Sequence, residues 1–195
     1  MIIAVKEKEG VVFGYTNRQS LASLALKDYV DEENVPMGFF KNGNAFSFSI
    51  LNRQSDIFCY DEEFLKMEPT PKSIVREIIP YIKAKLIENG CANEEGSWKN
   101  ALVISDGEHI YGVDTEFNFY EVEDFATHSF SSAAIKSCLD ATKDMDAEKR
   151  IVCATVFLED VYGDQLFPIA IMDVKSKERK CVYKGADTDE YSFSI

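Results

Sequence analysis

Two groups near the start of the sequence could together carry out acyl transfer: the α-amino group of Met1 and the hydroxyl group of Thr16. A hydroxyl becomes a nucleophile when a base accepts its proton, and an α-amine, with an ordinary pKa of about 8, can be that base. The two groups would have to lie within hydrogen-bonding reach of each other. The chemistry therefore depends on the elements that position them.

The first eighteen residues predict a β-hairpin that begins at the very first residue. Two apolar, β-branched runs flank Glu7-Lys8-Glu9-Gly10, and three charged residues followed by glycine are typical of a turn. This hairpin places Thr16 beside the N-terminus. With no leader before the first strand, we expect the α-amino group to be held inside the architecture.

Composition excludes several classes of function. The 195 residues carry a formal net charge of −13 and 46% hydrophobic residues, which predicts a single domain, 1–195, with a substantial core. That charge would repel a phosphate backbone, and no Lys/Arg stripe interleaves with aromatic residues, so we expect no nucleic-acid binding. No apolar run approaches a membrane-spanning length, so we predict a cytoplasmic protein with no membrane contact.

The cysteines do not follow a metal-binding or disulfide pattern. They are odd in number and include no C-x-x-C pair, and only His109 and His128 could add imidazole ligands. We expect reduced, mostly buried thiols, no metal site and no cofactor. The cysteines are Cys59, Cys91, Cys138, Cys153 and Cys181.

Strand signals occur in three groups after a polar segment, 19–33, that could be a short helical or looped stretch. Asn42-Gly43 between two apolar runs within 34–50 predicts a second hairpin. Three short runs within 101–122 predict an antiparallel meander, and two further strands are expected at 167–174 and 180–183.

Helix signals lie between these strand groups. We predict helices at 56–67, 70–89, 131–141 and 147–161. Thr70 is the expected N-cap of the second, Pro80 should kink it, and Asn89-Gly90 should end it. This order predicts an α+β fold, a four-layer αββα sandwich of two stacked, mainly antiparallel sheets flanked by helix pairs.

Several short motifs in this order resemble proteasome β-type subunits, a group that includes a related ATP-dependent peptidase of bacteria and belongs to the N-terminal nucleophile hydrolases. The motifs are Gly10-Val11-Val12 in the hairpin, Ala101-Leu102-Val103-Ile104 and Phe119-Tyr120-Glu121-Val122 in the meander, the segment 126–133, and Glu159-Asp160-Val161-Tyr162-Gly163 before the strand Ile169-Ala170-Ile171-Met172. The resemblance covers essentially the whole chain as an order of elements.

The resemblance implies a catalytic site that this sequence does not supply. In the family, an N-terminal Thr provides both the attacking hydroxyl and the accepting amine, and an Asp and a Lys support it. Carried across, Met1 takes the place of the family's second residue, Thr16-Asn17-Arg18 replaces its Asp-Ser-Arg, and Asn34 replaces its Lys. Sliding the alignment by one residue would place Met1 at the position of the family's nucleophile. The thioether of Met1 cannot attack a carbonyl.

Later elements of the family site are partly kept. Ser129 matches a Ser near the N-terminus and Asp160 matches an Asp, but Tyr162-Gly163 lacks the Ser expected next. We interpret Ser129 and Asp160 as structural polar groups that cap helices or tie loops. We interpret His128 as a surface or helix-entry residue rather than a base.

The resemblance therefore predicts a non-catalytic proteasome-like protein, an assembly or binding module without a catalytic residue. Its vestigial pocket positions are Met1, Thr16, Arg18, Asn34, Ser129 and Asp160. The alternative is an active N-terminal nucleophile hydrolase, a threonine-type peptidase or amidase with a rebuilt site. We expect self-association, with a dimer favoured over a ring, and a protein partner.

Overall fold

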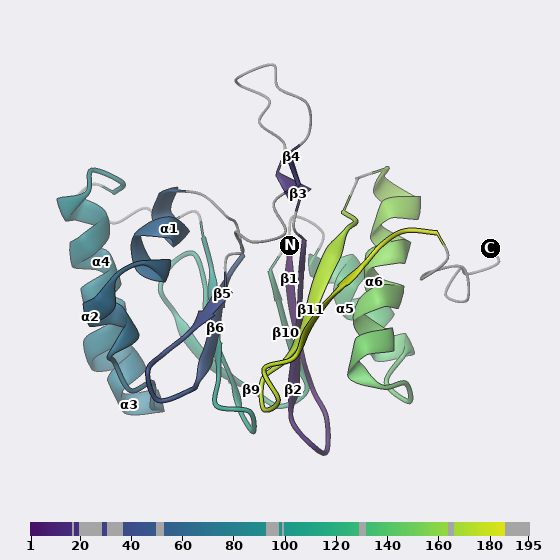
Figure 1. The fold of residues 1–195 in the computed structure, drawn as a ribbon, viewed down its shortest axis with the longest axis horizontal. Helices are drawn as coiled ribbons and strands as arrows, with labels where there is room; N and C mark the ends of the chain where they lie inside the picture. The colour runs from purple at the N-terminus through teal and green to yellow at the C-terminus, as the bar shows by residue number, and fades with distance from the viewer. Residues whose placement is uncertain are drawn as a thin grey trace. The chain divides into compact units, whose positions relative to one another are not determined.

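Two compact units make up the part of the chain that the computed structural model describes, namely residues 1–16, 18–19, 29–30, 37–49, 53–92, 98, 100–128, 132–163 and 166–185. Unit 1 combines Met1–Val35 with Thr127–Ile195, and unit 2 is Pro36–Ala126. Two five-stranded sheets with accompanying helices account for most of the described residues (Figure 1).

The opening hairpin forms the centre of the first sheet. Its strands, in spatial order, are β10 (Phe125–His128), β1 (Ile2–Lys6), β2 (Val11–Thr16), β11 (Ile169–Asp173) and β12 (Arg179–Val182). Ile2 pairs with Tyr15, and the Glu7 amide donates to the Gly10 carbonyl at 2.7 Å, which confirms the predicted hairpin and turn. The sequence reading missed β10.

The two predicted helices of unit 1, α5 (Ser132–Ala141) and α6 (Ala147–Tyr162), are present. Asp146 caps α6, and Gly163 ends it in the left-handed conformation, at φ 71°. Helix α6 packs on β1 and β2 so closely that a Cβ atom on Gly14 would lie 2.3 Å from Ile151 Cγ2. Gly14 therefore permits the close approach of the helix to the sheet.

A two-stranded sheet pairs β3 (Arg18–Gln19) with β4 (Tyr29–Val30), near the two ends of the polar segment 19–33 for which we expected a short helical or looped stretch. The rest of that segment lies outside the described residues.

The second sheet is the predicted hairpin followed by the predicted meander. In spatial order it contains β5 (Met37–Phe39), β6 (Ala45–Phe48), β7 (Leu102–Ser105), β8 (Ile110–Val113) and β9 (Phe119–Val122). Each neighbouring pair runs antiparallel. Gly43 adopts φ 94° in the β5–β6 turn, as the Asn-Gly signal indicates.

Two helices, α1 (Arg53–Cys59) and α2 (Glu62–Leu65), replace the single helix predicted at 56–67. Asp61 breaks the pattern because its side chain accepts hydrogen bonds from the Glu63 and Phe64 amides and so starts a new helix. The next helical segment follows the prediction: Thr70 and Ser73 form a capping box, and Gly90 follows its end.

That segment consists of α3 (Pro71–Ser73), a π-helical turn η2 (Ile74–Ile78) and α4 (Ile79–Glu88). The π turn precedes Pro80, where we expected a kink. Proline lacks an amide hydrogen and its ring crowds the carbonyl four residues earlier, so a wider turn before it relieves the crowding.

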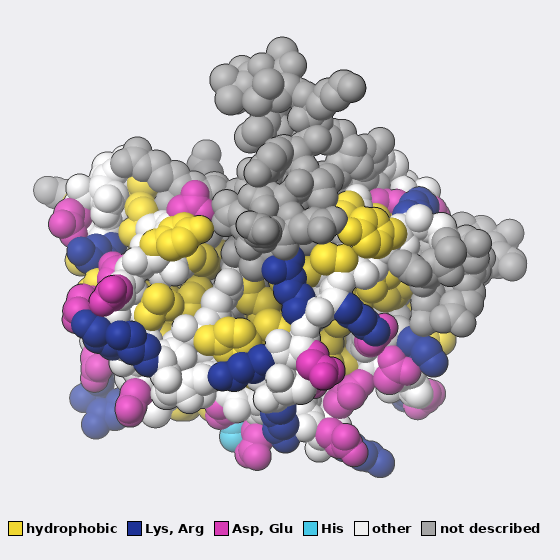
Figure 2. Space-filling model, viewed as in Figure 1, with side chains coloured by type: hydrophobic (Ala, Val, Ile, Leu, Met, Phe, Trp, Pro, Cys, Tyr) yellow, Lys and Arg dark blue, Asp and Glu magenta, His cyan; other side chains and the backbone are white. Residues whose placement is uncertain are grey.

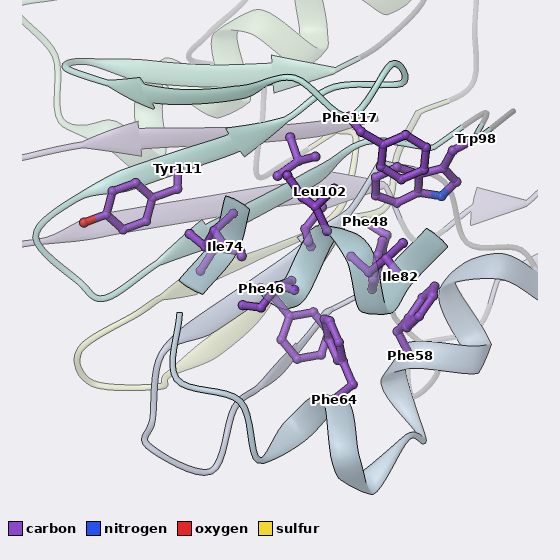
Figure 3. Packing of buried hydrophobic residues seen from close by; sticks show 14 of the residues in the cluster. Phe46, Phe48, Phe58, Phe64, Ile74, Ile82, Trp98, Leu102, Tyr111 and Phe117 are labelled. Atoms are coloured by element: carbon purple, nitrogen blue, oxygen red, sulfur yellow. The ribbon is translucent and has the colours of Figure 1, made fainter. Parts of the chain in front are cut away.

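Aromatic rings and isoleucines from these helices and from β6–β8 form the core of unit 2 (Figure 3). Phe64 of α2 meets Phe46 of β6 edge to face, with ring centroids 5.3 Å apart, and Trp98 stacks on Phe117 at 5.0 Å. The two mainly antiparallel sheets and their helices confirm the predicted α+β sandwich class.

Candidate functional site

Met1 and Thr16 lie next to each other at the same end of the β1–β2 hairpin. The Thr16 amide donates to the Met1 carbonyl at 3.3 Å, and Thr16 also pairs with Ile169 of β11. The hairpin therefore brings the backbones of these two residues together.

The hydroxyl of Thr16, however, donates a hydrogen bond to a backbone carbonyl. Its Oγ1 donates to the carbonyl of Leu166, 2.7 Å away. Leu166 is buried and belongs to the segment that leads into β11. A hydroxyl proton that is directed to a backbone carbonyl is not directed to a base.

Glu159, near the end of α6, holds that carbonyl in place. Its side chain is buried, and its Oε1 accepts hydrogen bonds from the amides of Leu166 at 2.5 Å and Phe167 at 2.9 Å. Charge-assisted bonds of this kind are short and strong. Glu159 therefore fixes the backbone to which Thr16 is bonded.

Lys184, just after β12, completes this network. Its Nζ lies 2.7 Å from Glu159 Oε2 and 3.6 Å from Asp160 Oδ1. The hydrogen bond to Glu159 raises the pKa of Lys184 above its ordinary value. Asp160 is exposed and its ion pair joins α6 to the segment after β12, in line with a structural role for this position.

The α-amino group of Met1 is deeply buried. Burial removes water from the ammonium form and lowers the pKa of this amine from 8.0 to about 6. Burial therefore favours the neutral form of the amine, the form that can accept a proton. The residue that carries it has only a thioether side chain, which is not a nucleophile toward carbonyls.

The other predicted positions are described only in part. The backbone of Arg18 belongs to β3, whereas its side chain, Asn34 and Ser129 lie outside the described residues. The backbone of His128 ends β10, and its side chain lies outside the described residues. Its neighbour Thr127 donates its hydroxyl to the Ile2 carbonyl at 3.1 Å and so ties β10 to β1.

Sequence reasoning missed the Glu159 network, although a signal was present. Glu159 continues the apolar face of the helix predicted at 147–161, and a carboxylate on a buried face requires hydrogen-bond donors. Its donors come from residues seven, eight and 25 positions later, which no local pattern identifies.

Other kinds of site find little support in the described ranges. No three His, Cys, Asp or Glu side chains there gather as metal ligands, and none of the five cysteines forms a disulfide. Cys138 and Cys153 are buried, and the other three cysteines are partly exposed. Fewer of the thiols are therefore buried than we expected from the sequence. No described helix is both long and apolar enough to cross a membrane.

Three solved structures with a similar fold are distant from this chain in sequence. BPH of Thiobacillus denitrificans in complex with epoxomicin shares 12% identity, with 89% of this chain and 98% of that chain covered and a TM-score of 0.70. Anbu from Pseudomonas aeruginosa, described as a helical assembly, shares 15%, with 94% and 86% covered and a TM-score of 0.65. HslV from Trypanosoma brucei shares 13%, with 88% and 98% covered and a TM-score of 0.57.

These three are proteasome-like proteins, so the similarity confirms the fold that the sequence motifs suggested. No protein-family model and no curated protein matches the sequence. Identities of 12–15% show a shared fold and not a shared activity.

Proposed function

We propose that this chain, which has the fold of the proteasome-like N-terminal nucleophile hydrolases, is a non-catalytic protein of that fold that works as an assembly or binding module. The observation that carries the proposal is the bond from the Thr16 hydroxyl to the Leu166 carbonyl. Thr16 stands where the family resemblance implies an Asp. A neutral hydroxyl committed to the backbone cannot supply the negative charge that an Asp would contribute.

The surroundings of Thr16 support this reading. Glu159, the buried carboxylate of this region, is saturated by two backbone amides and by Lys184. Asp160, which the resemblance aligns with a support residue, is exposed and 3.6 Å from Lys184. These groups hold the backbone of the hairpin end and of the segment before β11, which is what a structural scaffold requires.

Hydrolysis of fluorogenic peptides and of casein tests the proposal. We expect the full chain to show no turnover above a Thr16→Val control, which has nearly the shape of Thr but no hydroxyl. Turnover that is present in the parent chain and lost in Thr16→Val would overturn the proposal.

An alternative function has one specific observation in its favour. Burial lowers the pKa of the Met1 amine and so favours its neutral form, and the Met1 carbonyl accepts a hydrogen bond from the Thr16 amide, so a rebuilt threonine-type peptidase or amidase site would find a base on the neighbouring residue. It would require the Thr16 hydroxyl to leave Leu166 and turn toward the amine. The family geometry uses one residue for both roles, and for this reason we favour the non-catalytic function.

We further propose that the chain is one domain, 1–195, that self-associates in the cytoplasm, with a dimer favoured over a ring, and that it binds another protein. The proposed contact surfaces between copies are the helices α5 and α6 and the helical segment 70–89. A two-fold contact needs only a self-complementary patch, whereas a head-to-tail contact must close a circle. On the face in Figure 2, acidic and basic side chains are interspersed, whereas nucleic-acid-binding surfaces gather Lys and Arg.

A further inference from the structure

A groove of about 520 Å³ lies in unit 1, between the N-terminal end of α6 and the first sheet. Small-molecule sites usually have volumes of about 300–1,000 Å³, so the groove is large enough for an organic ligand. Val12 of β2 and Asp173 of β11 both line it and pair with each other. Thr16 pairs with Ile169 at the opposite end of the same two strands. The groove is therefore separate from the region around Thr16.

Two apolar side chains, Val12 and Ile171, line the groove, and both are buried. Ile171 pairs with Gly14, where an added Cβ would point at Ile151 of α6. Because residues two apart on a strand share a face, Val12 points to the α6 side as well. A hydrocarbon chain that covered Val12 and Ile171 would be removed from water, which favours an amphipathic ligand.

Five carboxylates also line the groove, namely Glu7, Asp146, Glu148, Asp173 and Glu178. Asp146 is paired with Lys149, and Glu148 with Lys180. The other three form no ion pair in the ranges that the structure describes. The acidic lining therefore has capacity for further positive charge.

The two basic lining residues, Arg179 and Lys180, point to opposite faces of the sheet. The Arg179 guanidinium lies over the ring of Tyr15, 5.9 Å from its centre, on the face away from α6 because Tyr15 follows Gly14. The Lys180 Nζ lies on the α6 side, 2.5 Å from Glu148 Oε1. An alkylammonium group of the chain itself thus already binds one carboxylate of the groove.

We propose that this groove binds a linear aliphatic polyamine, a chain of methylene groups that carries several ammonium groups. The methylene groups contact Val12 and Ile171, and the ammonium groups pair with Asp173 and Glu178. Among the described residues, no three Asp, Glu, His or Cys side chains gather as metal ligands, so separate ammonium groups match these carboxylates better than a single metal ion does.

Calorimetric titration of the full chain with spermidine at physiological salt tests the site. We expect one spermidine per chain. Asp173→Asn combined with Glu178→Gln should weaken binding about tenfold, the joint effect of two surface ion pairs. Asn can still accept the hydrogen bond that the Ser176 amide donates to Asp173, and Glu178 is exposed, so folding is preserved.

A matched control removes the same charge from exposed positions that do not line the groove. Glu68→Gln combined with Glu77→Gln in unit 2 should change the affinity by less than about twofold, because salt screens distant charges. Equal weakening by the two double variants would reduce the effect to net charge and overturn the site.

A second variant should bind more tightly. Lys180→Met keeps an unbranched apolar side chain but removes the ammonium group that competes for Glu148, so spermidine affinity should rise up to about fivefold. The melting temperature should change little, since exposed ion pairs contribute little to stability. Lys72→Met, which removes an exposed charge from unit 2, should leave the affinity unchanged. An equal rise in both variants would contradict the assigned role of Glu148.

The apolar part of the site is tested with two ligands of the same charge. Putrescine, a diamine, carries a hydrocarbon chain and Mg²⁺ does not, so putrescine should bind more tightly. Equal affinities for the two would rule out a contribution from Val12 and Ile171. Absence of saturable spermidine binding up to about 1 mM would overturn the proposal as a whole.

Discussion

Thr16 donates its hydroxyl to the Leu166 carbonyl at 2.7 Å, across 150 residues of sequence. This bond ties the end of the second strand to the segment that enters β11, and Glu159 holds that segment from the other side through two amides. These hydrogen bonds join the end of the hairpin, the end of α6 and the segment before β11.

Glu159→Gln should destabilise unit 1 by about 1.5–3 kcal/mol, the usual contribution of a hydrogen bond to a charged group. The amide keeps the shape of the side chain but loses the negative charge that faces Lys184 and the two backbone amides. Thermal or urea unfolding measures the loss. Asp160→Asn is the matched control, since this neighbour faces the same lysine but is exposed, and it should change stability by less than about 0.5 kcal/mol. Equal effects of the two substitutions would contradict the assigned role of Glu159.

The stability of the chain should rise with pH between about 6 and 8 because of the Met1 amine. Its pKa is about 6 in the folded state and 8.0 when exposed, so in this window the unfolded state binds more protons than the folded state. The destabilisation is complete below pH 6, absent above pH 8, and amounts to about 2–3 kcal/mol for a shift of this size. Urea unfolding across the window measures it. An N-terminally acetylated chain has no titrating amine and should lack this rise; an unchanged rise would assign it to another group.

Gly14→Ala should destabilise the packing of α6 on the first sheet by about 1–3 kcal/mol, as overpacking of a core usually does. The added Cβ would lie 2.3 Å from Ile151 Cγ2, so Ile151→Ala in the same chain should relieve part of the loss. A double-mutant cycle by chemical denaturation measures this coupling. Gly112→Ala is the control, because a Cβ there meets no atom within 4 Å. Strict additivity of the Gly14 and Ile151 substitutions would show that the contact is absent in solution.

Self-association should give a dimer at tens of micromolar protein and physiological salt. The net charge of −13 opposes larger assemblies, because each added copy brings repulsion that only buried apolar area can offset. Light scattering decides the mass. A strictly monomeric mass would refute self-association, and a mass of twelve or more copies would refute the preference for a dimer.

Elements with strong local signals were predictable from sequence. The turn at Glu7–Gly10 and the Thr70 cap each depend on a few adjacent residues, and the structure has both where expected. The helix break at Asp61 also carried a local signal, an Asp followed by two Glu residues, but the continuous apolar pattern around it favoured one helix.

The elements that were missed depend on distant partners. Strand β10 lies beside β1, and Thr127 bonds to the Ile2 carbonyl 125 residues away. The carboxylate of Glu159 is stable in a buried position only because the chain returns to it at Leu166 and Lys184. Neither arrangement leaves a periodicity or spacing in the sequence, so the fold class could be predicted while the bonding at the candidate site could not.

The central claim, that Thr16 and the Met1 amine do not form a working nucleophile and base, is tested most directly by covalent labelling. The full chain is incubated with epoxomicin, the ligand of the Thiobacillus denitrificans structure, and its intact mass is measured, with Thr16→Val treated in parallel. We predict an unmodified mass for both chains. A stoichiometric adduct on the parent chain, located on Met1 or Thr16 by peptide mapping and absent from Thr16→Val, would contradict the account.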